Sequence, residues 1–257
     1  MTIRLAVCGA GGRMGSRIID LASQDSRFKV TGGVERAGHP LVGRLLTKGI
    51  PVVSHIEELL GKTDVVVDFT TVEATLKHAR ACAKAKTAMA IGTTGWNNKS
   101  LRELKRILKR VPFVLSPNMS LAANLLFQLT AEAGRRLSSY DAEIIEIHHN
   151  QKKDAPSGTA LRLADELNKA RGGILKTVFG RKGQWGIRKS RELGVMAVRA
   201  GDIPGDHTVI LAGTGERLEL THRAHSRDGF ARGALEAAAW VSRKRRGHYD
   251  MKDVLGL

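Results

Sequence analysis

The glycine-rich stretch Gly9-Ala10-Gly11-Gly12-Arg13-Met14-Gly15 follows the apolar run Ile3–Cys8, and a helical pattern over Gly12–Ser23 begins within it. A dinucleotide pyrophosphate needs close approach of the main chain and helix N-terminal amides aimed at it, and glycines at such a turn provide both. Met14 stands where the usual G-x-G-x-x-G spacing has its last glycine. The stretch predicts a dinucleotide-binding turn; an ordinary tight strand-to-helix turn is the alternative.

Further strand ends extend this pattern. Glu35 follows the predicted strand Phe28–Val34, where an acidic residue binds the ribose hydroxyls of a dinucleotide. Arg36 suits adenine stacking or a 2′-phosphate, so the pair is compatible with NADH and with NADPH; a solvated loop arginine is the alternative. Phe69-Thr70 and Gly92-Thr93-Thr94-Gly95 fall at the carboxyl edge of the same sheet. The second of these predicts a backbone cradle beside nicotinamide, with an ordinary turn as the alternative.

The first half of the chain alternates β-rich runs with helical segments, which is typical of βα units on a mainly parallel sheet. The predicted strands are Ile3–Cys8, Phe28–Val34, Val65–Phe69, Thr87–Ile91 and Pro112–Leu115. The predicted helices are Gly12–Ser23, Val72–Ala85 and Lys99–Lys109. This order predicts an α/β, Rossmann-type dinucleotide-binding domain.

The second half is richer in strands, which favours an α+β domain with an antiparallel or mixed sheet. Its predicted elements are the helices Leu121–Leu137 and Ser157–Lys169 and the strands Asp141–His148, Gly194–Val198, His207–Leu211 and Arg217–His222. The alanine-rich helix Asp228–Lys244 is expected to pack back on the first domain. We therefore expect a dinucleotide-binding domain over residues 1–119 and 228–257, and a second domain over residues 120–227.

Candidate chemistry concentrates in His148-His149-Asn150-Gln151-Lys152-Lys153-Asp154-Ala155-Pro156-Ser157-Gly158-Thr159. Histidine transfers protons near neutral pH, and adjacent strand residues face opposite ways, so His148 and His149 are expected to have separate roles. Residues 157–159 offer amides and hydroxyls at a helix N-terminus, which favours an anion site; a simple N-cap at Ser157 is the alternative. No third ligand at a familiar spacing accompanies the histidines, so no metal is expected.

Composition narrows the class of protein. The chain has 257 residues, of which 42% are hydrophobic and 26% charged, as in a globular protein of one large or two ordinary domains. Its two cysteines, Cys8 and Cys82, predict neither a disulfide framework nor a CxxC metal site. We find no signal-peptide pattern and no run near the ~18 apolar residues of a spanning helix, so we expect a cytoplasmic protein with no membrane partner.

The charge is unusual: 42 Lys+Arg against 25 Asp+Glu leave a net charge of +17. A nucleic-acid partner is not expected, because aromatic residues are only 4% and no nucleic-acid module is recognisable. The basic residues placed to receive a dinucleotide and a small acid are Arg13, Arg36, Lys152 and Lys153. The stretches Lys99–Arg110, Arg171–Arg191 and Arg243–Arg246 are interpreted as solvated surface or loop.

Five motifs together resemble the 4-hydroxy-tetrahydrodipicolinate reductase family, formerly called dihydrodipicolinate reductase. They are Gly9–Gly15, Gly92–Gly95, His148–Ala160, Arg199–Val209 and Thr221–Arg227. The resemblance covers essentially the whole chain. It implies NAD(P)H-dependent reduction of (2S,4S)-4-hydroxy-2,3,4,5-tetrahydrodipicolinate to tetrahydrodipicolinate with loss of water, in lysine biosynthesis via diaminopimelate. It further implies a homotetramer in which the domain over residues 120–227 binds substrate and forms the interface.

The resemblance also implies residue roles. His148 matches the proton donor or acceptor and Lys152 the second proton donor, while the substrate contacts are His149, Gly158 and Thr159, to which we add Ser157. The cofactor residues are Gly9, Ala10, Gly11, Gly12, Arg13, Met14, Glu35, Arg36, Gly92, Thr93, Thr94, Ser116, Pro117, Asn118 and Met119, to which we add the strand end Phe69. Better-known relatives carry basic residues where this chain has Asn150-Gln151, so Lys153 competes with Lys152 for its role.

Two other enzyme-fold interpretations remain. A different NAD(P)-dependent amino-acid dehydrogenase on the same two-domain plan would explain the glycine turn and Glu35. It would not explain His148-His149 together with Lys152 and the Ser157-Gly158-Thr159 turn. A non-catalytic relative that uses the fold for regulation is disfavoured, because both His148 and Lys152 are retained.

Overall fold

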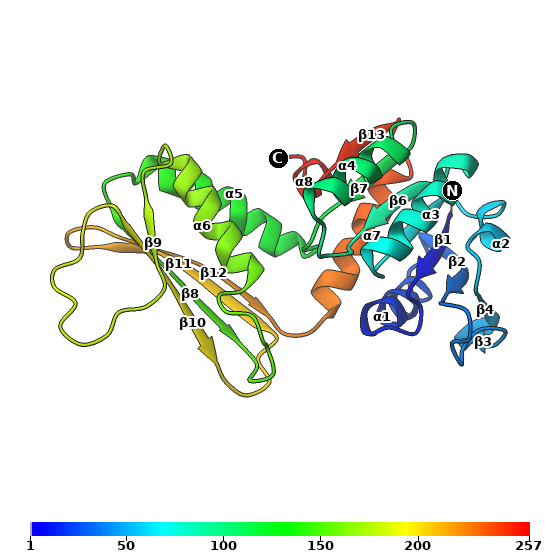
Figure 1. Cartoon of the computed structure of the whole chain (residues 1–257), viewed down its shortest axis with the longest axis horizontal. Helices are drawn as coiled ribbons and strands as arrows, with labels where there is room; N and C mark the ends of the chain where they lie inside the picture. Colours follow the sequence, from blue (N-terminus) through cyan, green and yellow to red (C-terminus); the bar gives the residue numbers. More distant parts are fainter. Residues whose placement is uncertain (1) are drawn as a thin grey trace. The chain divides into compact units, whose positions relative to one another are not determined.

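The structure, a computed structural model, describes residues 2–257, except for the side chain of Lys48. The chain divides into two compact units (Figure 1). One unit comprises the chain up to Leu121 together with Arg227–Leu257, and the other comprises Ala122–Ser226. Within the described part of the chain, no helix combines the length and the apolar character needed to cross a membrane.

The first unit contains an eight-stranded sheet in the order β13-β7-β6-β5-β1-β2-β4-β3. Its strands are β1 (Ile3–Cys8), β2 (Phe28–Val34), β3 (Leu45–Leu46), β4 (Ile50–Val53), β5 (Val65–Asp68), β6 (Ala88–Ile91), β7 (Pro112–Leu115) and β13 (Gly247–Tyr249). Pairing is parallel throughout, except between β3 and β4. Because β2 and β5 lie on opposite sides of β1, the strand order reverses there, and doubly wound sheets bind ligands at the carboxyl edge of such a point.

Helices cover both faces of this sheet, so its inner strands β5 and β6 are buried at every position. Its helical segments are α1 (Arg13–Ala22), η1 (Thr47–Gly49), α2 (Glu57–Leu60), α3 (Val72–Ala85), α4 (Asn98–Ile107), α7 (Asp228–Val241) and α8 (Met251–Leu255). Leu5 and Val7 belong to the core that includes α1 and α7, whereas Ala6 and Cys8 belong to the core that includes α3 and α4. This alternation explains why Leu5–Cys8 of β1 is a continuous apolar run.

The returning helix α7 packs closely because its inner face is made of small residues. A Cβ at Gly233 would lie 1.8 Å from the carbonyl oxygen of Met119, so only glycine allows this approach. Ala231, Ala234, Ala237 and Ala238 are fully buried beside it in the same core. Helix α7 therefore packs on the sheet of the first unit.

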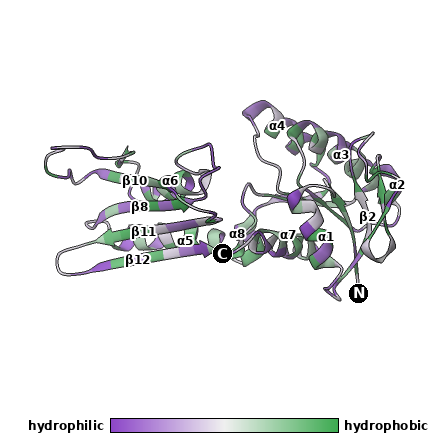
Figure 2. Ribbon diagram, turned by 90° about the horizontal axis from the view of Figure 1, so that it is seen from below, coloured by the Kyte–Doolittle hydropathy of each residue, from purple (hydrophilic) through white to green (hydrophobic). Residues whose placement is uncertain are grey.

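The second unit contains a mixed five-stranded sheet in the order β12-β11-β8-β10-β9. Its elements are β8 (Asp141–His148), β9 (Lys176–Val178), β10 (Glu192–Arg199), β11 (Gly205–Ala212), β12 (Arg217–Ala224), α5 (Leu121–Arg136) and α6 (Gly158–Ala170). Strand β8 pairs in parallel with β10 and antiparallel with β11, which confirms the predicted mixed sheet. Burial alternates along β8, so Ala142, Ile144, Glu146 and His148 share the face that packs with α6. In Figure 2 the strands of this sheet carry both hydrophilic and hydrophobic segments.

Arg171, Arg181 and Arg188 lie in connections between elements, as interpreted, but their side chains bind other parts of the second unit instead of only solvent. Arg171 donates hydrogen bonds to the backbone oxygens of Gly134, Leu137 and Tyr140, at and after the C-terminus of α5, where helical carbonyls lack intrahelical donors. Arg181 and Arg188 both form ion pairs with Glu143 on β8. The stretch lacks acids of its own because its partners lie elsewhere in the chain.

Candidate functional site

A cavity of about 810 Å3 lies in the first unit at the carboxyl ends of β1, β2 and β5. Its lining includes Gly9, Gly12, Val34, Glu35, Arg36, Phe69, Thr70 and His78. The volume is within the range of roughly 300–1,000 Å3 that small-molecule sites occupy. Neither Gly92–Thr94 nor residues 116–119 are among its lining residues, within the part of the chain that the structure describes.

The glycine turn packs against itself and against the end of β2. Gly9 has a φ of +80°, which favours glycine, and Gly12 is the N-cap residue of α1. A Cβ at Gly15 would lie 2.0 Å from the carbonyl oxygen of Gly9, so this glycine allows the helix to pack on the turn. The Glu35 carboxylate accepts a hydrogen bond of 2.8 Å from the Gly11 amide. Exposed Arg36 follows Glu35 at the cavity wall.

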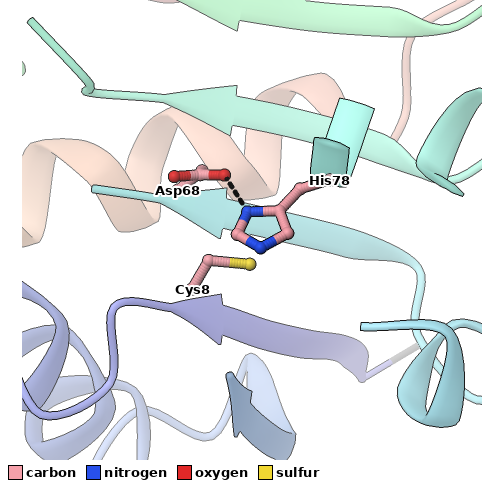
Figure 3. Close-up of side chains that lie close together, drawn as sticks. All are labelled: Cys8, Asp68 and His78. Atoms are coloured by element: carbon pink, nitrogen blue, oxygen red, sulfur yellow. Dashed lines mark hydrogen bonds and ion pairs between the residues drawn. The ribbon is translucent and has the colours of Figure 1, made fainter. Parts of the chain in front are cut away.

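A hydrogen-bonded cluster that the sequence analysis missed lies at the wall of this cavity (Figure 3). The fully buried Asp68, at the end of β5, lies 2.8 Å from His78 Nδ1 through one oxygen and accepts from the hydroxyls of Thr70 and Thr75 through the other. Cys8 lies beside the His78 ring, and burial raises the pKa of its thiol well above the usual value. Ligand atoms of Cys8, Asp68 and His78 lie within 4.8 Å of one another. Through Thr75 and His78, Asp68 therefore links the end of β5 to α3 at the wall of the cavity.

The other predicted cofactor segments follow β6 and β7. A Cβ at Gly92 would lie 2.3 Å from the Phe69 ring, so the glycine makes room for that ring. The Thr93 side chain is buried, and its Oγ1 lies 2.8 Å from Thr75 Oγ1. After β7, the Ser116 hydroxyl donates to the Asn118 carbonyl oxygen, and Met119 is buried in the core with α7.

In the second unit, β8 presents Glu146 and His148 two residues apart on the buried face. Glu146 Oε2 lies 2.5 Å from His148 Nδ1. Arg199, at the end of β10, donates from Nη1 to Oε2 at 2.8 Å and from Nη2 to Oε1 at 2.9 Å. The Ser157 amide also donates to Oε1, at 2.9 Å. Sequence reasoning identified His148 but assigned no role to Glu146 or Arg199.

These contacts shift the pKa of both partners. Burial raises the pKa of Glu146, but hydrogen bonds from Arg199, His148 and the Ser157 amide outweigh it and hold that pKa below the usual value. Burial lowers the pKa of His148, and the charges of Lys152 and Arg199 lower it further, against the opposing effect of Glu146. The site therefore contains a buried carboxylate beside a histidine that gives up its proton readily.

The N-terminus of α6 borders this pair. Ser157 Oγ accepts from the Ala160 amide, so the N-cap interpretation of Ser157 is confirmed. Strand β8 ends at His148, and the half-buried His149 donates its amide to the Ile203 carbonyl oxygen. Lys152 Nζ donates to Asp154 Oδ1 at 2.9 Å, and its side chain is 21% exposed. Gly158 and Thr159 start the helix on the solvent-accessible side.

Sequence reasoning also assigned no role to His207, which the register of β11 places opposite both Glu146 and His222. The rings of His207 and His148 lie edge to face, with their centroids 5.1 Å apart. His207 Nε2 lies 3.0 Å from Ser157 Oγ. Burial, followed by the charge of His148, lowers the pKa of His207 to about 3. The ring is therefore neutral across the range in which an exposed histidine becomes charged.

This burial makes the free energy of unfolding depend on pH. Below pH 6.5 the unfolded chain binds a proton at His207 that the native state does not bind until about pH 3, so stability falls with decreasing pH across that window. Within this window the free energy of unfolding changes by about 1.4 kcal/mol per pH unit. We therefore expect His207 to make the protein about 2 kcal/mol less stable at pH 5 than at pH 7. Urea denaturation of His207→Gln should show a weaker pH dependence by that amount, with exposed His225→Gln as control. Equal slopes in the wild type and His207→Gln would contradict this prediction.

Comparison with known proteins agrees with the resemblance. The protein-family model described as dihydrodipicolinate reductase, N-terminus, matches residues 3–119. The family model described as dihydrodipicolinate reductase, C-terminus, matches residues 122–255. The 4-hydroxy-tetrahydrodipicolinate reductase of Aquifex aeolicus (strain VF5) is 50% identical and aligns over 100% of both chains. That of Syntrophobacter fumaroxidans (strain DSM 10017 / MPOB) is 46% identical over 99% of both chains.

Solved structures confirm the fold. A dipicolinate-bound dihydrodipicolinate reductase from Paenisporosarcina sp. TG-14 has a TM-score of 0.81 at 23% identity, over 97% of this chain and 98% of that one. An amine dehydrogenase from Mycobacterium smegmatis reaches a TM-score of 0.61 at 14% identity. The Rossmann-type unit followed by a mixed-sheet unit is thus shared with other dehydrogenases, whereas the full-length sequence match is specific. The chain belongs to the dihydrodipicolinate reductase family.

Proposed function

We propose that this chain reduces (2S,4S)-4-hydroxy-2,3,4,5-tetrahydrodipicolinate to tetrahydrodipicolinate with loss of water, the reaction for which its relatives are named, in lysine biosynthesis via diaminopimelate. The observation that carries the proposal is the buried Glu146–His148 pair beside the N-terminus of α6, in the segment that matches the family. A positioned proton donor next to an anion-binding helix end is what reduction of a cyclic dicarboxylate requires.

The first unit is suited to a nicotinamide dinucleotide. The turn Gly9–Gly12 lets the backbone approach a pyrophosphate, the N-terminus of α1 favours negative charge, and the cavity wall carries Glu35 where ribose hydroxyls bind. We propose that Arg36 and Glu35 allow both NADPH and NADH, since Arg36 suits a 2′-phosphate and Glu35 a free ribose. The bound cofactor supplies the hydride.

Residues of the second unit bind the substrate and move its protons in this proposal. The amides of Gly158 and Thr159, with Ser157 capping the helix, hold one substrate carboxylate, and His149 adds a contact. His148 donates the proton that completes the reduction. Lys152 assists as a second donor and stabilises developing negative charge. Holding the ring by its carboxylate restricts its orientation, which favours hydride transfer.

Steady-state kinetics with freshly prepared substrate test the proposal. Oxidation of NADPH or NADH at 340 nm should depend on substrate, and 2,6-pyridinedicarboxylate, a planar dicarboxylate, should inhibit competitively with it. KM values for the two cofactors measure the proposed dual use. Substrate-independent oxidation, or turnover only with other amino acids, would favour a different NAD(P)-dependent dehydrogenase on the same plan.

We also propose a cytoplasmic homotetramer in which the second units form the interface. Their sheet packs α5 and α6 on one face, while the other face carries half-buried Ile145, Ile147 and Ile210 and the exposed Val198. A partly apolar sheet face of this kind favours association with another copy. Light scattering in solution should give about four times the 27.9 kDa mass of the chain, and a monomeric mass would contradict the assembly.

A further inference from the structure

The buried carboxylate of Glu146 has a further role, which rests on the proposed function of His148. We propose that Glu146 is a positioning residue that holds His148 with the proton on Nδ1, so that Nε2 is the nitrogen that exchanges a proton with the substrate. Arg199 is the residue that holds Glu146 in place.

Hydrogen bonding determines the tautomer. Each Glu146 oxygen has two partners: Oε1 accepts from Arg199 Nη2 and the Ser157 amide, and Oε2 accepts from Arg199 Nη1 and lies 2.5 Å from His148 Nδ1. A guanidinium and an amide only donate, and an ionised carboxylate only accepts. Nδ1 must therefore carry the hydrogen in this contact. The low pKa of Glu146 agrees with an ionised carboxylate at this position.

The other ring nitrogen has space kept beside it. A Cβ at Gly205 would lie 2.8 Å from His148 Nε2 and 3.2 Å from its Cδ2, so any larger residue would crowd that edge of the ring. Gly205 also has a φ of +153°, a conformation that side chains with a Cβ rarely adopt. His207 contacts the His148 ring edge to face at 5.1 Å. Glu146 thus holds Nδ1, while glycine at position 205 keeps a side chain away from Nε2.

Arg199 joins the segments that carry the three proposed functional groups. Besides Glu146 on β8, its Nη2 donates to the Asp154 carbonyl oxygen at 2.6 Å, in the loop that contains Lys152. Glu146 in turn holds the amide of Ser157, the N-cap residue of α6. The ion pair between buried Glu146 and part-buried Arg199 therefore sets the relative positions of the proton donor, the lysine loop and the helix end proposed to bind the carboxylate. Arrangements of this kind raise rates by holding groups in reactive geometry.

Glu146→Gln tests the role through the pH profile. The variant should reduce kcat/KM by about 10- to 100-fold, because the imidazole loses its fixed orientation. Loss of the carboxylate charge lowers the pKa of His148, so the alkaline decline of kcat/KM should shift to lower pH. Glu146→Asp keeps the charge and should return the profile toward that of the wild type. Glu143→Gln is the matched control. Its carboxylate lies on the same strand but accepts hydrogen bonds from Arg181 and Arg188, not from Arg199, so the pH profile should stay unchanged.

Nitrogen-15 NMR of the histidine rings gives a readout that needs no activity. The His148 signals are assigned by their loss in His148→Gln. At a pH where the ring of the wild type is neutral, they should show a protonated Nδ1 and an unprotonated Nε2. A protonated Nε2, or a Glu146→Gln pH profile identical to that of the wild type, would overturn the inference. Absence of reductase activity in the wild type would instead overturn the proposed function, and the NMR spectrum would still decide the tautomer.

Discussion

His148→Gln is expected to lower kcat by about 10²–10⁴-fold, the contribution that a positioned general acid typically makes. Gln keeps a polar side chain of similar size beside Glu146 but cannot transfer a proton. Because the cofactor cavity is lined by residues of the first unit, the KM for NADPH should change little. A loss in kcat without a loss in cofactor binding indicates a role confined to the transition state.

Steady-state rates at saturating substrate measure this effect. The control is His225→Gln, which removes an exposed histidine of the same unit and should retain full activity. Circular dichroism should show that both variants are folded. A His148→Gln enzyme that turns over at the wild-type rate would remove His148 from the proton transfer.

Lys152→Met is expected to lower kcat by about 10²–10³-fold, comparable to the loss of one donor that stabilises transition-state charge. Methionine retains most of the length and apolar volume of lysine but has no ammonium group. The variant should also weaken inhibition by 2,6-pyridinedicarboxylate, since the positive charge favours binding of a dianion. The inhibition constant and kcat are therefore measured together.

The neighbouring residue provides the matched control. Lys153 is exposed, whereas the Lys152 side chain is only 21% exposed and is held by Asp154. Lys153→Met should retain kcat within a few-fold, because a freely moving surface ammonium adds little. The opposite outcome, a large loss in Lys153→Met and none in Lys152→Met, would assign the second donor to Lys153.

Local patterns in the sequence were sufficient to predict the main helices and strands. The strands β1, β2, β7 and β8 and the helix α3 have the predicted bounds, and the other predicted elements end within three residues of the observed ones. Their apolar periodicity or glycine boundaries are local signals. The short elements β3, β4, α2, β9, β13 and α8 were not predicted. The equally short β5 and β6 are fully buried, mostly apolar runs, whereas β3, β9 and β13 have no buried position and so no apolar signal of that kind.

The candidate site of the second unit was only partly predictable for a different reason. His148, Lys152 and Ser157 lie in one short segment, so their clustering is visible in the sequence. Arg199 reaches Glu146 because β10 pairs with β8, and His207 lies opposite Glu146 because β11 pairs with the other edge of β8. Strand register depends on the whole sheet, and no local pattern in residues 192–212 specifies it.

The return of α7 to the first unit has a consequence for how the protein is made. The core that contains Leu5, Val7 and Val67 is completed by Ala231–Val241, which are translated after the whole of Ala122–Ser226. At about 5–20 residues per second, an emerging chain spends many seconds with one face of the first sheet uncovered by its last helix. The contiguous unit Ala122–Ser226 can close its own core during this interval. The nascent dinucleotide-binding unit therefore waits for the last part of the chain to leave the ribosome before its core is complete.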